Sequence, residues 1–225
     1  AIEGVETGGG ADTLVLTTAD DAVSVQDGNR LRAGDILFGG IDAVEGNGGS
    51  DSLTLTDKAD TISVTGIGAF QHAGVGFTKF SAVIGGAGTD VITLSPLADT
   101  LTVSAPKLLA VSGLSFSQFE TVDALGGDDQ VILSPGSNAV TVLGTRSIGV
   151  FDLTLNNIER VAGNGGGDTV LLGAGNDQIG LIGTNAFGVA GIEFTAFSGI
   201  DAGPGLDLVT LSSGNDQVQG LAAGS

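Results

Sequence analysis

The chain has 225 residues, of which 40 are glycine, and a formal net charge of −19 from 26 acidic and 7 basic residues. It contains no Cys, Met, Trp or Tyr and a single His, which excludes a disulfide framework, a thiolate metal site and a multi-histidine zinc site. The negative charge favours cations and argues against nucleic acid as a partner, and no apolar run is long enough for membrane insertion.

Short segments in which apolar residues alternate with small or polar ones recur along the chain, and this alternation is typical of half-buried strands. The first four predicted strands are 14–16, 23–25, 36–38 and 43–45, and the next four are 53–55, 62–64, 75–77 and 82–84. Clusters of Gly, Asn and Asp separate them and predict turns. No segment has a helical pattern, so we expect an all-β chain.

The pattern repeats every 39 residues without insertion or deletion. One column of the repeat is always aspartate, at Asp12, Asp51, Asp90, Asp129, Asp168 and Asp207. Glycine precedes each of these by two residues, at Gly10, Gly49, Gly88, Gly127, Gly166 and Gly205. A second polar column lies nine residues after the first, at Asp21, Asp60, Asp99, Asn138, Asp177 and Asp216. Such strict periodicity predicts a solenoid.

We therefore predict a right-handed parallel β-solenoid (a β-roll or β-helix). Residues 1–225 would form a single solenoid of about six 39-residue repeats, with the first and last incomplete and no caps visible. Equivalent strands of successive coils are expected to pair in parallel about 4.8 Å apart. The pattern leaves open whether a repeat makes one coil or two. One coil would stack the aspartate column at a cost of about 3–4 kcal/mol per neighbouring pair at an effective dielectric of 20, which favours two coils.

Part of each repeat resembles the calcium-binding repeats of RTX proteins. Gly85–Thr93 matches the nonapeptide Gly-Gly-x-Gly-x-Asp-x-apolar-x, and Gly46–Thr54 and Gly163–Leu171 match it with asparagine as the second residue. The rest is similar in style to the tandem repeats of large bacterial surface proteins of the adhesin type. The resemblance implies Ca²⁺ as a cofactor, bound by turn carbonyls and carboxylates, with Asp51, Asp90, Asp168 and Asp177 as the candidate ligands.

A structural role for the aspartates is the competing hypothesis. Each carboxylate would fold back onto the N–H groups of its own turn, and Asn138 in the second column keeps that shape without the charge. RTX-type turns also need a partner turn on the same side of the roll. The segments in that place after Asp12 and Asp51, residues 29–32 and 68–71, contain no carboxylate. His72 lies in a column of otherwise small or apolar residues, so we interpret it as a tolerated near-surface substitution and not a catalytic group.

No acidic residue departs from the repeat as a catalytic residue would, so we expect a protein that is not an enzyme. The predicted function is an extracellular structural solenoid, a building block of a bacterial surface fibre, filament or adhesin stalk. The alternative is an RTX-type module that folds on Ca²⁺ after secretion. The expected partners are the chain itself, end to end, or further repeats of a longer chain, together with divalent cations. The absence of Cys and Met suits an exposed location at the bacterial cell surface.

Overall fold

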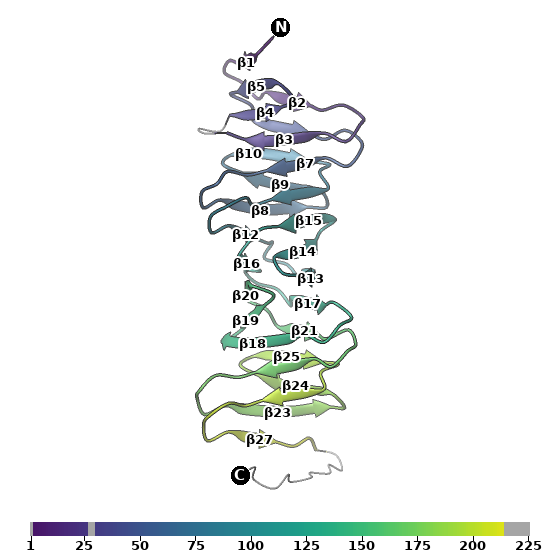
Figure 1. Cartoon of the computed structure of the whole chain (residues 1–225), viewed down its shortest axis with the longest axis vertical. Helices are drawn as coiled ribbons and strands as arrows, with labels where there is room; N and C mark the ends of the chain where they lie inside the picture. Colours follow the sequence, from purple (N-terminus) through teal and green to yellow (C-terminus); the bar gives the residue numbers. More distant parts are fainter. Residues whose placement is uncertain (1, 27–29, 214–225) are drawn as a thin grey trace.

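The computed structural model describes residues 2–26 and 30–213. These residues form two long β-sheets that run along one elongated shaft, with the first and last strands at opposite ends (Figure 1). Within the described residues one sheet has 15 strands and the other has 12. The same part of the chain contains no helix, and therefore none long and apolar enough to cross a membrane. The predicted all-β solenoid of stacked coils is confirmed.

Each repeat contributes five strands, one more than predicted. The first two are single strands, and each pairs in parallel with strands of neighbouring coils. The first strand of the repeat recurs as β1 (Gly4–Glu6), β6 (Ala43–Glu45), β11 (Ala82–Ile84), β16 (Thr121–Asp123), β21 (Arg160–Ala162) and β26 (Gly199–Asp201). The second recurs as β2 (Thr13–Val15), β7 (Ser52–Thr54), β12 (Val91–Thr93), β17 (Gln130–Leu133), β22 (Thr169–Leu171) and β27 (Leu208–Thr210).

The other three strands form an antiparallel meander. The third strand recurs as β3 (Ala22–Val25), β8 (Thr61–Gly66), β13 (Thr100–Ala105), β18 (Ala139–Gly144) and β23 (Gln178–Gly183). The fourth, which the sequence analysis missed, recurs as β4 (Leu31–Ala33), β9 (Ala69–His72), β14 (Leu108–Val111), β19 (Ser147–Val150) and β24 (Ala186–Val189). The fifth recurs as β5 (Ile36–Gly39), β10 (Val75–Thr78), β15 (Leu114–Ser117), β20 (Leu153–Asn156) and β25 (Ile192–Thr195). The fourth strand runs antiparallel to both neighbours, so pairing is parallel only outside the meanders.

Equivalent strands of successive repeats lie in opposite sheets. The chain places β1 in the 15-stranded sheet, β2 in the 12-stranded sheet, the meander β3–β5 back in the first sheet, and β6 in the second. A repeat therefore crosses between the sheets three times and makes one and a half coils, which corrects the expected two. Stacked strands are consequently not equivalent strands of the repeat. In the stack, Ser52 of β7 pairs with Ala22 of β3 and with Ala82 of β11.

The two sides of the shaft where turns pass from one sheet to the other are its edges. At the first edge, turns run from the 15-stranded to the 12-stranded sheet, and at the second edge they run back. The turns within a meander stay in one sheet. Backbone hydrogen bonds from the tips of these turns reach the meander of the next repeat in the other sheet. The Gly68 amide donates to the Ser112 carbonyl at 2.8 Å, and the equivalent amides of Lys107 and Arg146 donate to Phe151 and Ala190 at 3.0 and 2.9 Å. These three hairpin tips are thereby tied to the next repeat.

A single apolar core runs between the sheets. Inward-facing leucine, isoleucine and valine residues of the central single strands are almost completely buried, as in Leu53 and Ile92. Phenylalanines cluster where the meanders pack, with Phe70 stacked on Phe77 at 4.8 Å between ring centroids and Phe80 edge-on to both. The phenylalanines are therefore structural, because ring contacts and burial account for them.

The invariant glycine column is explained by the close approach of neighbouring coils. Gly49, Gly88, Gly127 and Gly166 have φ between 91° and 132°, a conformation that costs other residues strain. A Cβ atom at Gly88 would lie 2.5 Å from the Lys58 carbonyl oxygen, and one at Gly127 would lie 2.6 Å from the Leu97 carbonyl carbon. Glycine is thus required both by its own backbone and by the turn of the preceding coil.

Candidate functional site: stacked carboxylates at the edges

The first aspartate column lies in the turns that follow the first strand of each repeat. The first strands of successive repeats lie in opposite sheets, so the members of this column alternate between edges. Asp90 and Asp168 lie at the first edge, and Asp51 and Asp129 lie at the second. All four of these side chains are completely buried. Consecutive members of the column therefore do not stack on each other, and the repulsion used to choose between one and two coils does not arise.

Each of these aspartates binds the backbone of the coil before it. In every case Oδ1 accepts the N–H of the second-column residue that lies 30 positions earlier: Asp21 to Asp51 at 2.9 Å, Asp60 to Asp90 at 2.8 Å, Asp99 to Asp129 at 2.7 Å, Asn138 to Asp168 at 2.8 Å and Asp177 to Asp207 at 3.0 Å. The hypothesis that the carboxylate folds onto its own turn is wrong for this column, which joins neighbouring coils.

The same hypothesis is confirmed for Asp21 and Asp60 of the second column. Oδ2 of Asp21 accepts the N–H and the hydroxyl of Thr17 at 2.9 and 2.7 Å, and Oδ2 of Asp60 bonds Thr56 in the same way at 3.0 and 2.7 Å. Asn138 keeps the shape of the turn, since its amide group donates to the carbonyls of Ser134 and Gly136 at 2.9 and 2.8 Å. Asp216, the last member of the column, lies outside the described residues.

A third column completes the stack, and the sequence analysis missed it. Oε2 of Glu120 accepts the Asp90 amide at 2.7 Å, and Oε2 of Glu159 accepts the Asp129 amide at 2.8 Å. Serine replaces glutamate at the equivalent positions 81 and 198. The edges thus contain two carboxylate triads, Asp60–Asp90–Glu120 and Asp99–Asp129–Glu159, and two serine triads, Asp21–Asp51–Ser81 and Asn138–Asp168–Ser198. The spacing between columns could have revealed the third one. A second-column residue lies 30 positions before the next first-column aspartate, which is the 39-residue repeat less nine, and the third column lies a further 30 positions on.

The middle aspartate of each carboxylate triad holds its proton unusually tightly. Burial, reinforced by the charges of Glu120 and Asp60, raises the pKa of Asp90 to about 6 although the Asp60 amide opposes the shift. Burial and the charges of Glu159 and Asp99 likewise raise the pKa of Asp129 to about 6 against the effect of the Asp99 amide. Desolvation disfavours the charged form, and nearby like charges add to it.

A basic residue at the tip of the meander hairpin accompanies each glutamate of the third column. Lys107 Nζ lies 2.6 Å from Glu120 Oε1, and Arg146 pairs with Glu159 at 3.0 Å. In the serine triads the hairpin-tip positions are Gly68 and Asn185. Burial alone would raise the pKa of Glu120, but the Asp90 amide and the Lys107 ammonium lower it. The basic residue therefore supplies the charge that offsets a third carboxylate.

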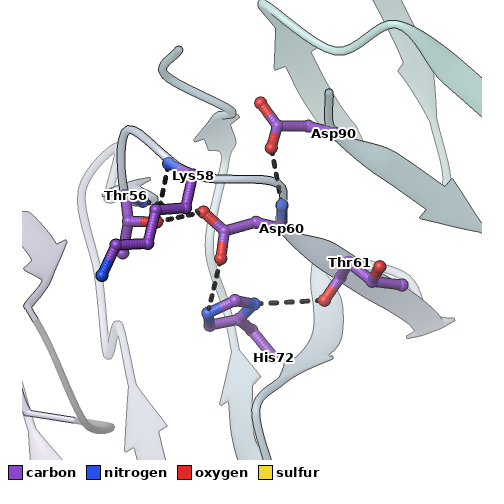
Figure 2. A network of polar contacts seen from close by, with 6 residues as sticks. All are labelled: Thr56, Lys58, Asp60, Thr61, His72 and Asp90. Carbon is purple, nitrogen blue, oxygen red and sulfur yellow. Dashed lines mark hydrogen bonds and ion pairs between the residues drawn. The ribbon is translucent and has the colours of Figure 1, made fainter. Parts of the chain in front are cut away.

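His72 extends one carboxylate triad into the core. His72 ends β9, and its side chain is buried, with Nδ1 3.1 Å from the Thr61 carbonyl and Nε2 3.7 Å from Oδ1 of Asp60 (Figure 2). The equivalent positions are Ala33, Val111, Val150 and Val189. The imidazole is thus a polar contact beneath the turn and lies deeper than the near-surface position that we predicted.

The four calcium candidates are not brought together. Asp51, Asp90 and Asp168 each occupy the middle of a different triad, and Asp177 belongs to the second column. Among the described residues no three Asp, Glu, His or Cys side chains are grouped so that they could bind a metal ion. One carboxylate oxygen of each candidate, Oδ2, is nevertheless buried without a hydrogen-bond partner. In the nonapeptide turns, a Cβ at Gly46, Gly85 or Gly163 would collide with this oxygen and with a backbone carbonyl oxygen, so the space beside it accommodates only glycine.

Asparagine in the nonapeptide turns has a left-handed conformation, with φ of 68° at Asn47 and 60° at Asn164, which asparagine tolerates better than most residues. No protein-family model, curated protein or solved structure matches this chain.

Proposed function

We propose that the chain is a non-enzymatic structural solenoid, a rigid building block of an extracellular bacterial surface fibre, filament or adhesin stalk. The observation that carries the proposal is the continuity of the two sheets along the described chain, with buried aspartates of the first column joining one coil to the one before it. Hydrogen bonds of the sheets run along the shaft axis, so bending the shaft would require breaking many of them together.

The distribution of charge supports a role as an exposed shaft. The acidic triads lie at the edges, whereas some outward positions of central strands are small and uncharged, such as Ser52, Ala82 and Ser115. Negative edges repel one another and keep shafts apart in solution, and divalent cations would reduce that repulsion. Parallel strand pairing also suits association along the axis with another copy or with further repeats of a longer chain.

Electron microscopy of the purified chain tests the proposal. At about 4.8 Å per strand, the 15-stranded sheet gives a rod about 70 Å long. Straight rods of this length, or fibres made from them, are the expected result. Flexible or globular particles would contradict a load-bearing shaft, and turnover of a polysaccharide by the purified chain would contradict the absence of enzyme activity.

A calcium-binding module that folds after secretion is the second candidate. It is favoured by the partnerless buried oxygens of Asp51, Asp90 and Asp168, because a cation is one way to compensate such atoms. Thermal unfolding with and without a chelator distinguishes the candidates. A fall in melting temperature on chelation that added Ca²⁺ reverses would support the calcium module, and an unchanged melting temperature would refute it.

A further inference from the structure

The second edge contains a carboxylic acid whose surroundings do not suit its charge. Asp129 is completely buried, and its Oδ1 accepts a single N–H, from Asp99. Its Oδ2 has no hydrogen-bond partner. Ala124, which is also completely buried, occupies the place where other repeats have a glycine against this oxygen. Half of the carboxylate is therefore enclosed without a donor, which is costly for an ion.

Like charges surround this group. Asp99 precedes it in the stack and Glu159 follows, and Asp128 is its neighbour in sequence. The nearest basic groups are committed elsewhere, with Arg146 on Glu159 and Arg160 on Asp128, each at 3.0 Å. The like charges and the burial act in the same direction, and both favour the neutral acid.

A proton on the free oxygen would supply the missing donor. In the repeats that have glycine beside this oxygen, the carbonyl oxygens of Lys79, Gln118 and Ala196 crowd the same point as Oδ2 of Asp51, Asp90 and Asp168. Asn157 stands at the equivalent sequence position for Asp129, where Ala124 replaces the glycine. A neutral carboxyl group has a proton to donate, which a carboxylate lacks.

We propose that Asp129 is a proton-binding site that makes the shaft tighten in mildly acidic solution. Uptake of one proton removes the buried charge and strengthens the contact between the coils that carry Asp99 and Glu159. This inference is independent of the proposed structural function, because it concerns only the stacking of neighbouring coils. The serine triad Asp21–Asp51–Ser81 is the internal comparison, since it has a hydroxyl where the third carboxylate would be.

The sign follows from the raised pKa of Asp129, about 6 in the folded chain. The folded state binds more protons than the unfolded state between about pH 4 and pH 6, so stability grows as the pH falls through this range and is lost above it. With an unfolded value of about 3.9, one such group lowers the unfolding constant about tenfold between pH 7 and pH 5.

Asp129→Asn in the full chain is the test, because asparagine keeps the shape and cannot titrate. In urea unfolding at pH 5 and pH 7, the unfolding constant of the variant is expected to change about tenfold less than that of the unmodified chain, with the contribution of Asp90, whose pKa is also raised to about 6, left in place. Asp128→Asn, an equal charge change at an exposed neighbour, is expected to retain the full change. Equal pH dependence in Asp129→Asn and the unmodified chain would overturn the proposal.

A direct titration keeps the proposal falsifiable if Asp129→Asn does not fold. The carboxyl carbon resonance of Asp129 in the unmodified chain is expected to titrate with a midpoint near pH 6. Glu159→Gln removes one like charge and is expected to move that midpoint downward. A carboxyl group that stays ionised to pH 4, or a midpoint that Glu159→Gln leaves unchanged, would overturn the proposal.

Discussion

The close contact between turns of neighbouring coils predicts that Gly166→Ala lowers the free energy of unfolding. Replacing Gly166 by alanine places a Cβ 2.5 Å from the Gly136 carbonyl carbon and 3.0 Å from the Ser137 amide nitrogen, at φ of 99°. Two costs combine, because the backbone conformation costs an ordinary residue about 1–3 kcal/mol and crowding in a packed interior costs about 1–3 kcal/mol. The expected loss in the free energy of unfolding is about 2–6 kcal/mol.

Gly165 provides the matched control. It has nearly the same φ, 92°, but a Cβ there meets no atom within 4 Å. Gly165→Ala should therefore show only the backbone cost, about 1–3 kcal/mol. The difference between the two variants isolates the steric contact between coils 30 residues apart.

Urea unfolding followed by far-ultraviolet circular dichroism measures both variants, since the chain has no Trp or Tyr to report by fluorescence. The reasoning is refuted if Gly166→Ala is no less stable than Gly165→Ala. That outcome would mean that neighbouring turns can separate at little cost and that the glycine column serves each turn alone.

Three further predictions concern the core and the hairpin-tip charges. Phe119→Ala should lose about 3–5 kcal/mol in urea unfolding, because the ring is completely buried and edge-on to its neighbour; a loss below 1 kcal/mol would contradict the packing. Lys107→Met should destabilise the chain at pH 7 but not near pH 3. The pKa of Glu120 is lowered in the folded chain, and the stability that such a group contributes is lost as the pH falls through its folded pKa. A loss that is the same at both pH values would rule out the charge effect. Ser81→Glu should destabilise the serine triad, and adding Gly68→Lys should restore stability. Lysine fits at position 68 because Gly68 and Lys107 share a left-handed conformation, with φ of 61° and 52°. A double variant no more stable than Ser81→Glu would show that the third column and the hairpin-tip residues are not coupled.

The chemistry of the site was only partly accessible from the sequence. The Asp columns, the asparagines that replace glycine and the core phenylalanines follow from repetition and residue type. The hydrogen-bond partners of the first column do not, because the donor to Asp90 is the amide of Asp60 on another coil, and a backbone amide leaves no mark in the sequence. Glu120 and Glu159 were missed because their column contains aspartate, serine and glutamate, at Asp42, Ser81, Glu120, Glu159 and Ser198, and so looks variable until the coil length is known.

The sequence by itself determined the repeat length, the all-β character and the glycine turns, since these depend on local periodicity and backbone conformation. Only the tertiary structure decided that 39 residues make one and a half coils. Equivalent strands of successive repeats therefore lie in opposite sheets, and strands from different positions of the repeat stack on one another. The physical reason is that a periodic sequence specifies where turns fall but not whether a turn crosses to the other sheet or returns within the same one. The two turns that fold each meander back are of the second kind, and as a result the triads are divided between the two edges of the shaft.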